Sequence, residues 1–310
     1  MRDIIFGPVK SRRLGDSLGI DLTPHKTCNL DCIYCECGKT TKLTNTRENY
    51  YKLEDILKEI DEAVRTRGHI DYITFSGSGE PALYKDIRKL ISEIKSRYPH
   101  IKLAILTNSL FLTDKDVFDA FLEADLVLPS IDSVLDEGFN KINRPHPDIR
   151  LAEVLESLIR FKKAYKGDLW AEVFICPGIN DTDKELTALA EYLKKLSPDK
   201  VQINTLDRPG TEKWLKPLDQ EGLDKVLKFF KGLPVDVVSR KLLSSEKKEE
   251  KGFEPVLETL KRRPLTLKDI VGMSGHTEAE ARTWIDTQIK AQKIDVNKVN
   301  DKETFYSIKK

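Results

Sequence analysis

The strongest constraint on the fold is a regular alternation of short apolar runs with amphipathic segments of helical length. Strand-like runs at 70–77, 101–108, 125–132, 168–178, 199–206 and 234–239 alternate with helical patterns at 53–68, 84–98, 113–124, 149–165, 181–196 and 219–232. Strands that alternate with helices of this length predict right-handed crossovers and a parallel sheet. With a first strand at 19–23, about six such units predict an open, partial (β/α)6 barrel rather than a closed eight-fold one.

Polar loops follow the carboxyl ends of these predicted strands. They read FSGSGEP, TNS, SID, CPG and NTLDRPG, and a cysteine-rich loop follows the first strand. Gly, Asn, Asp and Pro are ordinary turn residues, so one such loop carries little weight. Because chemistry in parallel α/β folds gathers at the carboxyl ends of the strands, the whole set predicts a site at that edge.

The last part of the chain has a different pattern. Residues 240–252 are polar and charged and predict a linker between a barrel at 1–239 and a second domain at 253–310. Three helical segments, 253–264, 265–275 and 276–293, precede a hairpin pattern, so we expect a winged helix-turn-helix.

The expected recognition helix of this domain, residues 276–293, has acidic residues near its start. Glu278 and Glu280 would be repelled by phosphate, which favours a protein-contact or substrate-presenting unit, or a structural cap. Nucleic-acid binding stays open through the basic segment 261–263 and the lysines of the hairpin.

Composition limits the compartment and the partners. Charged residues make up 33% of the 310 residues and nearly balance, with a formal net charge of +1, so no overall charge attracts nucleic acid or membrane. We find neither an apolar run of membrane-spanning length nor a secretory signal at the N-terminus, and expect a cytoplasmic protein without membrane contact. In that compartment, clustered cysteines favour metal binding or catalysis over disulfides.

The stretch KTCNLDCIYCECGKT, residues 26–40 and here named the cysteine loop, holds four of the five cysteines. Cys28, Cys32 and Cys35 have the spacing C-x3-C-x2-C. Zinc prefers four ligands, and Cys37 or His25 could complete such a set. Three thiolates on a compact loop also suit three irons of a 4Fe–4S cluster, with the fourth iron left open.

The triad and the Gly-rich turn together resemble the radical S-adenosylmethionine (radical SAM) superfamily. Three features carry the resemblance: C-x3-C-x2-C after the first strand, Tyr34 just before the third cysteine, and FSGSGEP at 75–81 after the second strand. It covers about residues 4–240. Segments 6–22, 76–84 and 142–147 are similar to a subgroup classed with the wyosine-forming tRNA enzymes.

The chain departs from the wyosine synthases at two points. No cysteine precedes Cys28, whereas those enzymes usually carry extra N-terminal cysteines for a second cluster. Glu36 and Cys37 follow the third cysteine, where those enzymes have Trp-Arg.

The resemblance implies an enzyme with one 4Fe–4S cluster on the cysteine triad and S-adenosylmethionine on the open iron. Reductive cleavage would give methionine and a 5′-deoxyadenosyl radical that takes a hydrogen atom from a tRNA base or from a peptide or protein. The electron would come from a reduced flavodoxin or a ferredoxin-type donor. The alternative from another class is a metal- or redox-sensing regulator that binds DNA through the winged helix.

The resemblance also implies S-adenosylmethionine contacts. They fall at Tyr34, Gly77, Ser78, Gly79, Glu80, Asn108, Ser130, Asp132, Glu172 and Gly178. The glycines would let the backbone approach the methionine moiety. Glu80 and Asn108 are as readily explained as turn residues.

Three further features have open alternatives. Glu172, on a buried strand, needs a partner, either a cofactor hydroxyl or a cation such as Arg144. The run 10–13 is either a solvated face or, with Arg144, an anion site. Cys176 is expected in the core, whereas Cys37 is a bystander thiol, a ligand or a redox participant.

Overall fold

A computed structural model describes residues 4–11, 13–238, 252–261, 263–299 and 303–309. Its main sheet has eight strands in the order β1-β2-β5-β6-β7-β8-β9-β10. They are β1 (Ile5–Ser11), β2 (Gly15–Ile20), β5 (Tyr72–Phe75), β6 (Lys102–Thr107), β7 (Leu126–Pro129), β8 (Asp168–Phe174), β9 (Lys200–Asn204) and β10 (Val235–Val237). All neighbouring pairs from β2 to β10 are parallel, and this confirms the predicted α/β class with a parallel sheet.

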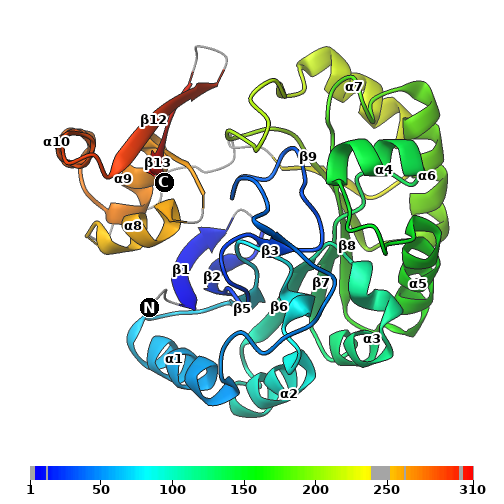
Figure 1. Cartoon of the computed structure of the whole chain (residues 1–310), viewed down its shortest axis with the longest axis horizontal. Coiled ribbons are helices and arrows are strands. Elements are labelled where there is room, and N and C mark those ends of the chain that lie inside the picture. The colour runs from blue at the N-terminus through cyan, green and yellow to red at the C-terminus, as the bar shows by residue number, and fades with distance from the viewer. Residues whose placement is uncertain (1–3, 12, 239–251, 262, 300–302, 310) are drawn as a thin grey trace.

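The crossover helices lie around the outside of the curved sheet, as Figure 1 shows. They are α1 (Leu53–Thr66), α2 (Ile87–Arg97), α3 (Lys115–Phe121), α4 (Asp136–Asn143), α5 (Leu151–Ala164), α6 (Asp183–Leu196) and α7 (Gln220–Phe229). Each predicted helix of this region is present. In α1 the buried residues Ile56, Leu57, Ile60 and Ala63 recur every three or four positions, which is the spacing that places them on one face.

One helix begins later than expected. The segment 113–124 was predicted to be helical, but a 3-10 turn, η2 (Leu110–Thr113), comes first and α3 begins at Lys115. Ser109, the residue before η2, has a left-handed φ of 69°, which turns the chain directly into this apolar 3-10 turn. Asp114 then caps α3 by accepting a hydrogen bond from the Asp116 N–H.

The tip of the β1–β2 hairpin fills the concave face of the sheet. Strand β1 pairs antiparallel with β2 and was not predicted. Leu14, at the tip, is buried against Ala104, Leu126 and Leu128 of β6 and β7. The hairpin tip therefore contributes an apolar side chain to the interior of the barrel.

The cysteine loop follows β2 and contains β3 (Thr27–Cys28), which pairs with β4 (Lys42–Leu43) beyond it. Two backbone bonds tie the loop to the end of α4: Asp31 N–H donates to Asn143 O (2.9 Å) and Ile33 N–H to Ile142 O (2.9 Å). Tertiary contacts hold the loop, because regular secondary structure here is limited to the two-residue β3.

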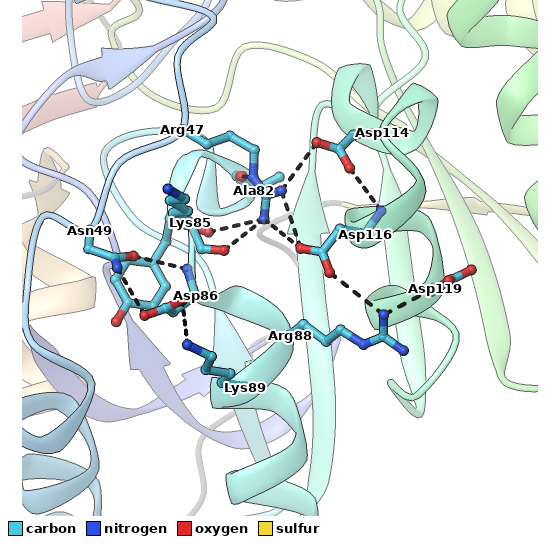
Figure 2. Close-up of polar contacts among 11 residues, drawn as sticks. Arg47, Asn49, Ala82, Lys85, Asp86, Arg88, Lys89, Asp114, Asp116 and Asp119 are labelled. Carbon is cyan, nitrogen blue, oxygen red and sulfur yellow. Dashed lines mark hydrogen bonds and ion pairs between the residues drawn. The ribbon is translucent and has the colours of Figure 1, made fainter.

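Arg47 fixes the arm that returns from the cysteine loop to the barrel wall (Figure 2). Its Nε donates to Ala82 O (3.0 Å) and its Nη2 to Lys85 O (3.0 Å). Its Nη1 lies 3.2 Å from Asp114 Oδ2 and 3.3 Å from Asp116 Oδ2. One half-buried guanidinium thus joins the returning arm, the turn after β5 and the start of α3.

The C-terminal unit has its own core of buried apolar residues. Its elements are α8 (Glu254–Leu260), β11 (Leu265–Thr266), α9 (Leu267–Ser274), α10 (Glu278–Lys290), β12 (Ile294–Val299) and β13 (Glu303–Ile308), with strand order β11-β13-β12. Three helices and a hairpin were predicted; the short third strand was not. The expected linker, apart from Gly252, and the hairpin turn at 300–302 lie outside the described residues.

Within the described residues, no helix combines the length and apolar character needed to cross a membrane.

Candidate metal centre

The three predicted ligand cysteines lie together on the cysteine loop. Cys28, Cys32 and Cys35 are half-buried free thiols. Among the described residues, no three His, Cys, Asp or Glu side chains converge as they would around a single metal ion. In a 4Fe–4S cluster each thiolate binds a different iron, so three separate sulfurs around a shared space are the arrangement such a cluster requires.

A buried lysine faces this thiol group. Lys26 has 3% of its surface exposed, and its Nζ lies 3.0 Å from Cys35 Sγ. Burial alone would lower the pKa of Lys26, but the neighbouring thiolates, Cys35 first, raise it above the ordinary value. A hydrogen bond from Cys37, with help from the Lys26 charge, lowers the pKa of Cys35 to about 5 although burial acts the other way. This donor set fits an anionic metal–thiolate group.

The other two sulfurs each lie near a side-chain amide. Asn143, the last residue of α4, has its Nδ2 3.4 Å from Cys32 Sγ. Asn108, just after β6, has its Nδ2 3.8 Å from Cys28 Sγ. Burial raises the pKa of both thiols, that of Cys28 to about 12. Each triad sulfur therefore has its own nitrogen neighbour, the kind of contact that tunes a ligating thiolate.

The sequence did not single out Lys26 or Asn143. Lys26 lies two residues before the first cysteine, and Asn143 lies inside INRPHP, a segment quoted only for its resemblance. A polar residue that flanks a cysteine motif suggests a contact with the ligated group. Whether its side chain points toward the sulfurs depends on the fold and cannot be told from the sequence.

The Gly-rich turn after β5 packs tightly against the segment that leads into the cysteine loop. A Cβ on Gly79 would lie 2.0 Å from Thr27 O, and one on Gly77 would lie 2.2 Å from Asp21 Cγ. Ser78 donates from its N–H (3.2 Å) and its Oγ (3.1 Å) to Asp21 Oδ2. The glycines are thus needed for a close approach within the chain, and their predicted contact with a cofactor stays a prediction.

Glu80 caps the turn that follows it. Its carboxylate accepts hydrogen bonds from Ala82 N–H (3.1 Å), Thr107 Oγ1 (2.7 Å) and Asn108 N–H (2.8 Å), and the Ala82 bond caps η1 (Pro81–Leu83). Its burial raises its pKa to about 7. The sequence left Glu80 as either a cofactor contact or a turn residue, and these hydrogen bonds are those of a turn residue.

Asp132 is the centre of a buried hydrogen-bond network. It accepts from Tyr34 OH (2.6 Å), Asn143 Nδ2 (2.7 Å) and Phe174 N–H (2.9 Å). Burial raises its pKa to about 6. The ring of Tyr34 stacks on Phe174 with centroids 3.9 Å apart and an interplanar angle of 6°. Asp132 therefore fixes Tyr34 and Asn143 beside the cysteines, and its expected ribose contact stays a prediction.

Glu172 pairs with a cation, but not with the one expected. It binds Arg13 Nη1 and Asn204 Nδ2, whereas Arg144 Nη1 lies 2.6 Å from Glu212 Oε1. The Arg144 alternative was wrong because Arg13, from the hairpin tip, reaches across the concave face. Arg144 is paired with Glu212, Arg13 is paired with Glu172, and Arg12 lies outside the described residues, so the anion site of residues 10–13 with Arg144 stays a prediction.

The remaining candidates lie at the same edge of the sheet. Ser130 is half-buried, and its backbone pairs with that of Glu172 in an isolated parallel β-bridge. Gly178 is exposed in the turn after β8, has a φ of 82°, and donates to Asp181 Oδ1 (2.8 Å). Cys176 is fully buried, as predicted. Cys37 directs its Sγ to Gly77 O at 3.6 Å, so it bridges the cysteine loop and the Gly-rich turn.

A curved parallel α/β sheet with three free cysteines on a loop at the carboxyl ends of its strands defines a partial-barrel α/β protein with a cysteine-rich site at that edge. The chain belongs to the radical SAM superfamily: the family model described as "Radical SAM superfamily" matches residues 22–193. Members of this superfamily are enzymes that use a 4Fe–4S cluster and S-adenosylmethionine.

Individual relatives are similar to this chain over nearly its whole length. A "UPF0026 protein" of Helicobacter pylori is 35% identical over 306 residues, which is 98% of this chain and 97% of that one. A "GTPase Obg" of Brachyspira hyodysenteriae is 37% identical over 301 residues, 96% of this chain but 44% of that protein, so the chain spans less than half of that relative.

A solved structure is similar in fold. A radical SAM methyltransferase from Sphaerobacter thermophilus has a TM-score of 0.54 at 17% identity, covering 73% of this chain and 67% of that one. At this identity the likeness concerns the fold alone.

Proposed function

We propose that the chain is a radical SAM enzyme whose cluster is bound by Cys28, Cys32 and Cys35. The observation that carries the proposal is the thiol triad at the carboxyl edge of the parallel sheet, faced by the buried ammonium of Lys26. When bound, the cluster supplies the electron that cleaves S-adenosylmethionine to methionine and a 5′-deoxyadenosyl radical.

The chain's own residues hold and orient the reactants. Lys26, Asn108 and Asn143 donate to the ligating sulfurs. Gly77 is exposed, and among the described residues its carbonyl oxygen has only the sulfur of Cys37 as a neighbouring donor, at 3.6 Å, so this oxygen is available to accept a hydrogen bond from the ammonium of a cofactor. We assign the methionine end of S-adenosylmethionine to this carbonyl, and its ribose to Ser130, just after β7, and to Glu172, on β8.

The C-terminal unit, which we interpret as a winged helix, supports a polypeptide substrate over a tRNA base. The first turn of α10 carries Glu278 and Glu280, and Glu280 is fixed in a capping box with Thr277. Carboxylates at the end of the helix that would enter a groove repel phosphate. A flavodoxin or ferredoxin-type protein is the proposed electron donor. Stimulation of turnover by total tRNA, and not by protein extract, would reverse the choice of substrate.

The test is reductive cleavage by the reconstituted protein. We would load the protein with iron and sulfide without oxygen, reduce it with dithionite, add S-adenosylmethionine and measure 5′-deoxyadenosine. Wild type and Cys176→Ala, which changes a core cysteine outside the triad, should form the product, and Cys32→Ala should not. A protein that binds one zinc ion and forms no product would show the proposal to be wrong.

A further inference from the structure

Lys26 is held rigidly where its side chain meets the sulfurs. Its backbone has a left-handed φ of 56°. Its carbonyl oxygen accepts hydrogen bonds from Thr41 N–H (3.0 Å) and Lys42 N–H (3.2 Å), which lie on the returning arm of the loop. Lys26 therefore has a strained backbone conformation, and hydrogen bonds from the returning arm hold it there. A solvated surface lysine needs no such constraint.

Among the described residues, the ammonium of Lys26 is paired with sulfur and not with a carboxylate. No carboxylate oxygen lies within 4.0 Å of its Nζ in the part of the chain that the structure describes, and the Nζ instead lies 3.0 Å from Cys35 Sγ. An isolated buried ammonium is costly, so such groups are paired with an anion or bound to one. The sulfurs of the triad are the groups that can supply this negative charge.

We propose that Lys26 is a positioning residue that serves as a built-in counter-charge for the iron–sulfur cluster and raises its reduction potential. The inference rests on the proposed function, because it requires a cluster on the triad. One-electron reduction adds one negative charge to the cluster, and the electron comes from the protein donor or from dithionite. An ammonium in contact with a ligating sulfur stabilises the reduced form more than the oxidised form.

The shift in reduction potential should come from the contact of Lys26 Nζ with Cys35 Sγ and not from the net charge of the cysteine loop. Lys39 belongs to the same cysteine loop and is exposed, so it provides a matched control. Lys26→Met removes the charge and keeps a similar volume, Lys26→Arg keeps the charge, and Lys39→Met removes one charge at a distance from the sulfurs.

The experiment is a redox titration of the reconstituted proteins, followed by electron paramagnetic resonance of the reduced cluster. Iron and sulfide content is measured first, and thermal denaturation of each apoprotein checks folding. We expect Lys26→Met to shift the midpoint potential to more negative values or to lose iron, with Lys26→Arg close to wild type and Lys39→Met unchanged. The Lys26→Met apoprotein should still fold, because Cys35 can take up a proton once the neighbouring ammonium is gone.

Three outcomes overturn the inference. They are an unchanged potential in a fully loaded Lys26→Met protein, an equal shift in Lys39→Met, and an unfolded Lys26→Met apoprotein, which would make the lysine structural. Failure of the proposed function looks different, since wild type itself would then bind no iron–sulfur cluster.

Discussion

Arg208, in the loop after β9, binds Asp269 of the C-terminal unit. Its Nη2 lies 3.3 Å from Asp269 Oδ2, and its Nη1 lies 3.5 Å from the carboxylate of Glu36, the neighbour of Cys35. The Arg208 side chain is 5% exposed. Asp269 in turn forms the capping box of α9 with Thr266. One buried guanidinium therefore connects the cysteine loop to the first turn of a helix in the C-terminal unit.

Replacing Arg208 by Leu should destabilise the protein by about 3 kcal/mol, because two carboxylates lose their shared cation in a largely buried place. Arg160→Leu is the matched control, since Arg160 is exposed on α5. Urea denaturation of both variants and wild type gives the difference. If Arg208→Leu unfolds at the same urea concentration as Arg160→Leu, the ion pairs contribute nothing.

The sequence predicted those parts of the fold that have a local signal. Crossover helices such as α1 repeat apolar residues every three or four positions, and this pattern is visible without tertiary information. Strand β1 was missed because Gly7 and Pro8 interrupt it, and Pro normally argues against a strand. Helix α4 has eight residues, too few for a clear period.

The same distinction holds for the site. The cysteine spacing is local and was sufficient to predict the triad. The pairing of Arg13 with Glu172 joins residues 159 positions apart, and the contact of Asn143 with Cys32 joins residues 111 apart. Such contacts depend on how the hairpin tip and α4 are placed, which no short pattern contains.

Arg47 and Arg88 lie in one charged cluster but should differ in their contribution to stability (Figure 2). Arg47 is 13% exposed and donates to backbone carbonyls as well as to carboxylates. Arg88 is 51% exposed and its Nη1 lies 3.6 Å from Asp116 Oδ1. Arg47→Ala should cost about 2–3 kcal/mol of unfolding free energy, whereas Arg88→Ala should cost under about 1 kcal/mol. Equal losses in urea denaturation would contradict this reading.

Gly79→Ala should disrupt the cysteine loop. The added Cβ meets the backbone oxygen of Thr27 at 2.0 Å, and a backbone atom cannot rotate away as a side chain does. We expect the iron bound after reconstitution to fall severalfold. Gly272→Ala is the control, since its Cβ meets nothing within 4 Å, and there helix propensity should add about 1 kcal/mol of stability. Normal iron binding by Gly79→Ala would show that the loop can move aside.

Glu80 should make the apoprotein less stable as the pH rises from about 5 to 7. Burial raises the pKa of this carboxyl from 4.5 to about 7 in the folded protein. Between these values the unfolded chain has lost the proton that the folded chain retains, so folding takes up a proton and a higher pH opposes it. The shift corresponds to about 3 kcal/mol, and Asp132, whose burial raises its pKa to about 6, adds a slope of the same sign at lower pH.

Glu80→Gln should therefore flatten the dependence of the unfolding free energy on pH, measured by urea denaturation at pH 5, 6, 7 and 8. Glutamine keeps the shape of the side chain but carries no titrating proton, so the difference in slope between wild type and Glu80→Gln should be the part due to Glu80. The slopes of Asp132 and of Cys35, whose pKa is lowered to about 5 and which therefore acts with the opposite sign, remain in both proteins. Glu123→Gln, at an exposed position after α3, is the control and should keep the wild-type slope. A Glu80→Gln protein with the full wild-type slope would mean that Glu80 is already ionised in the folded protein at pH 5, with its hydrogen bonds from Thr107 and Asn108 outweighing burial.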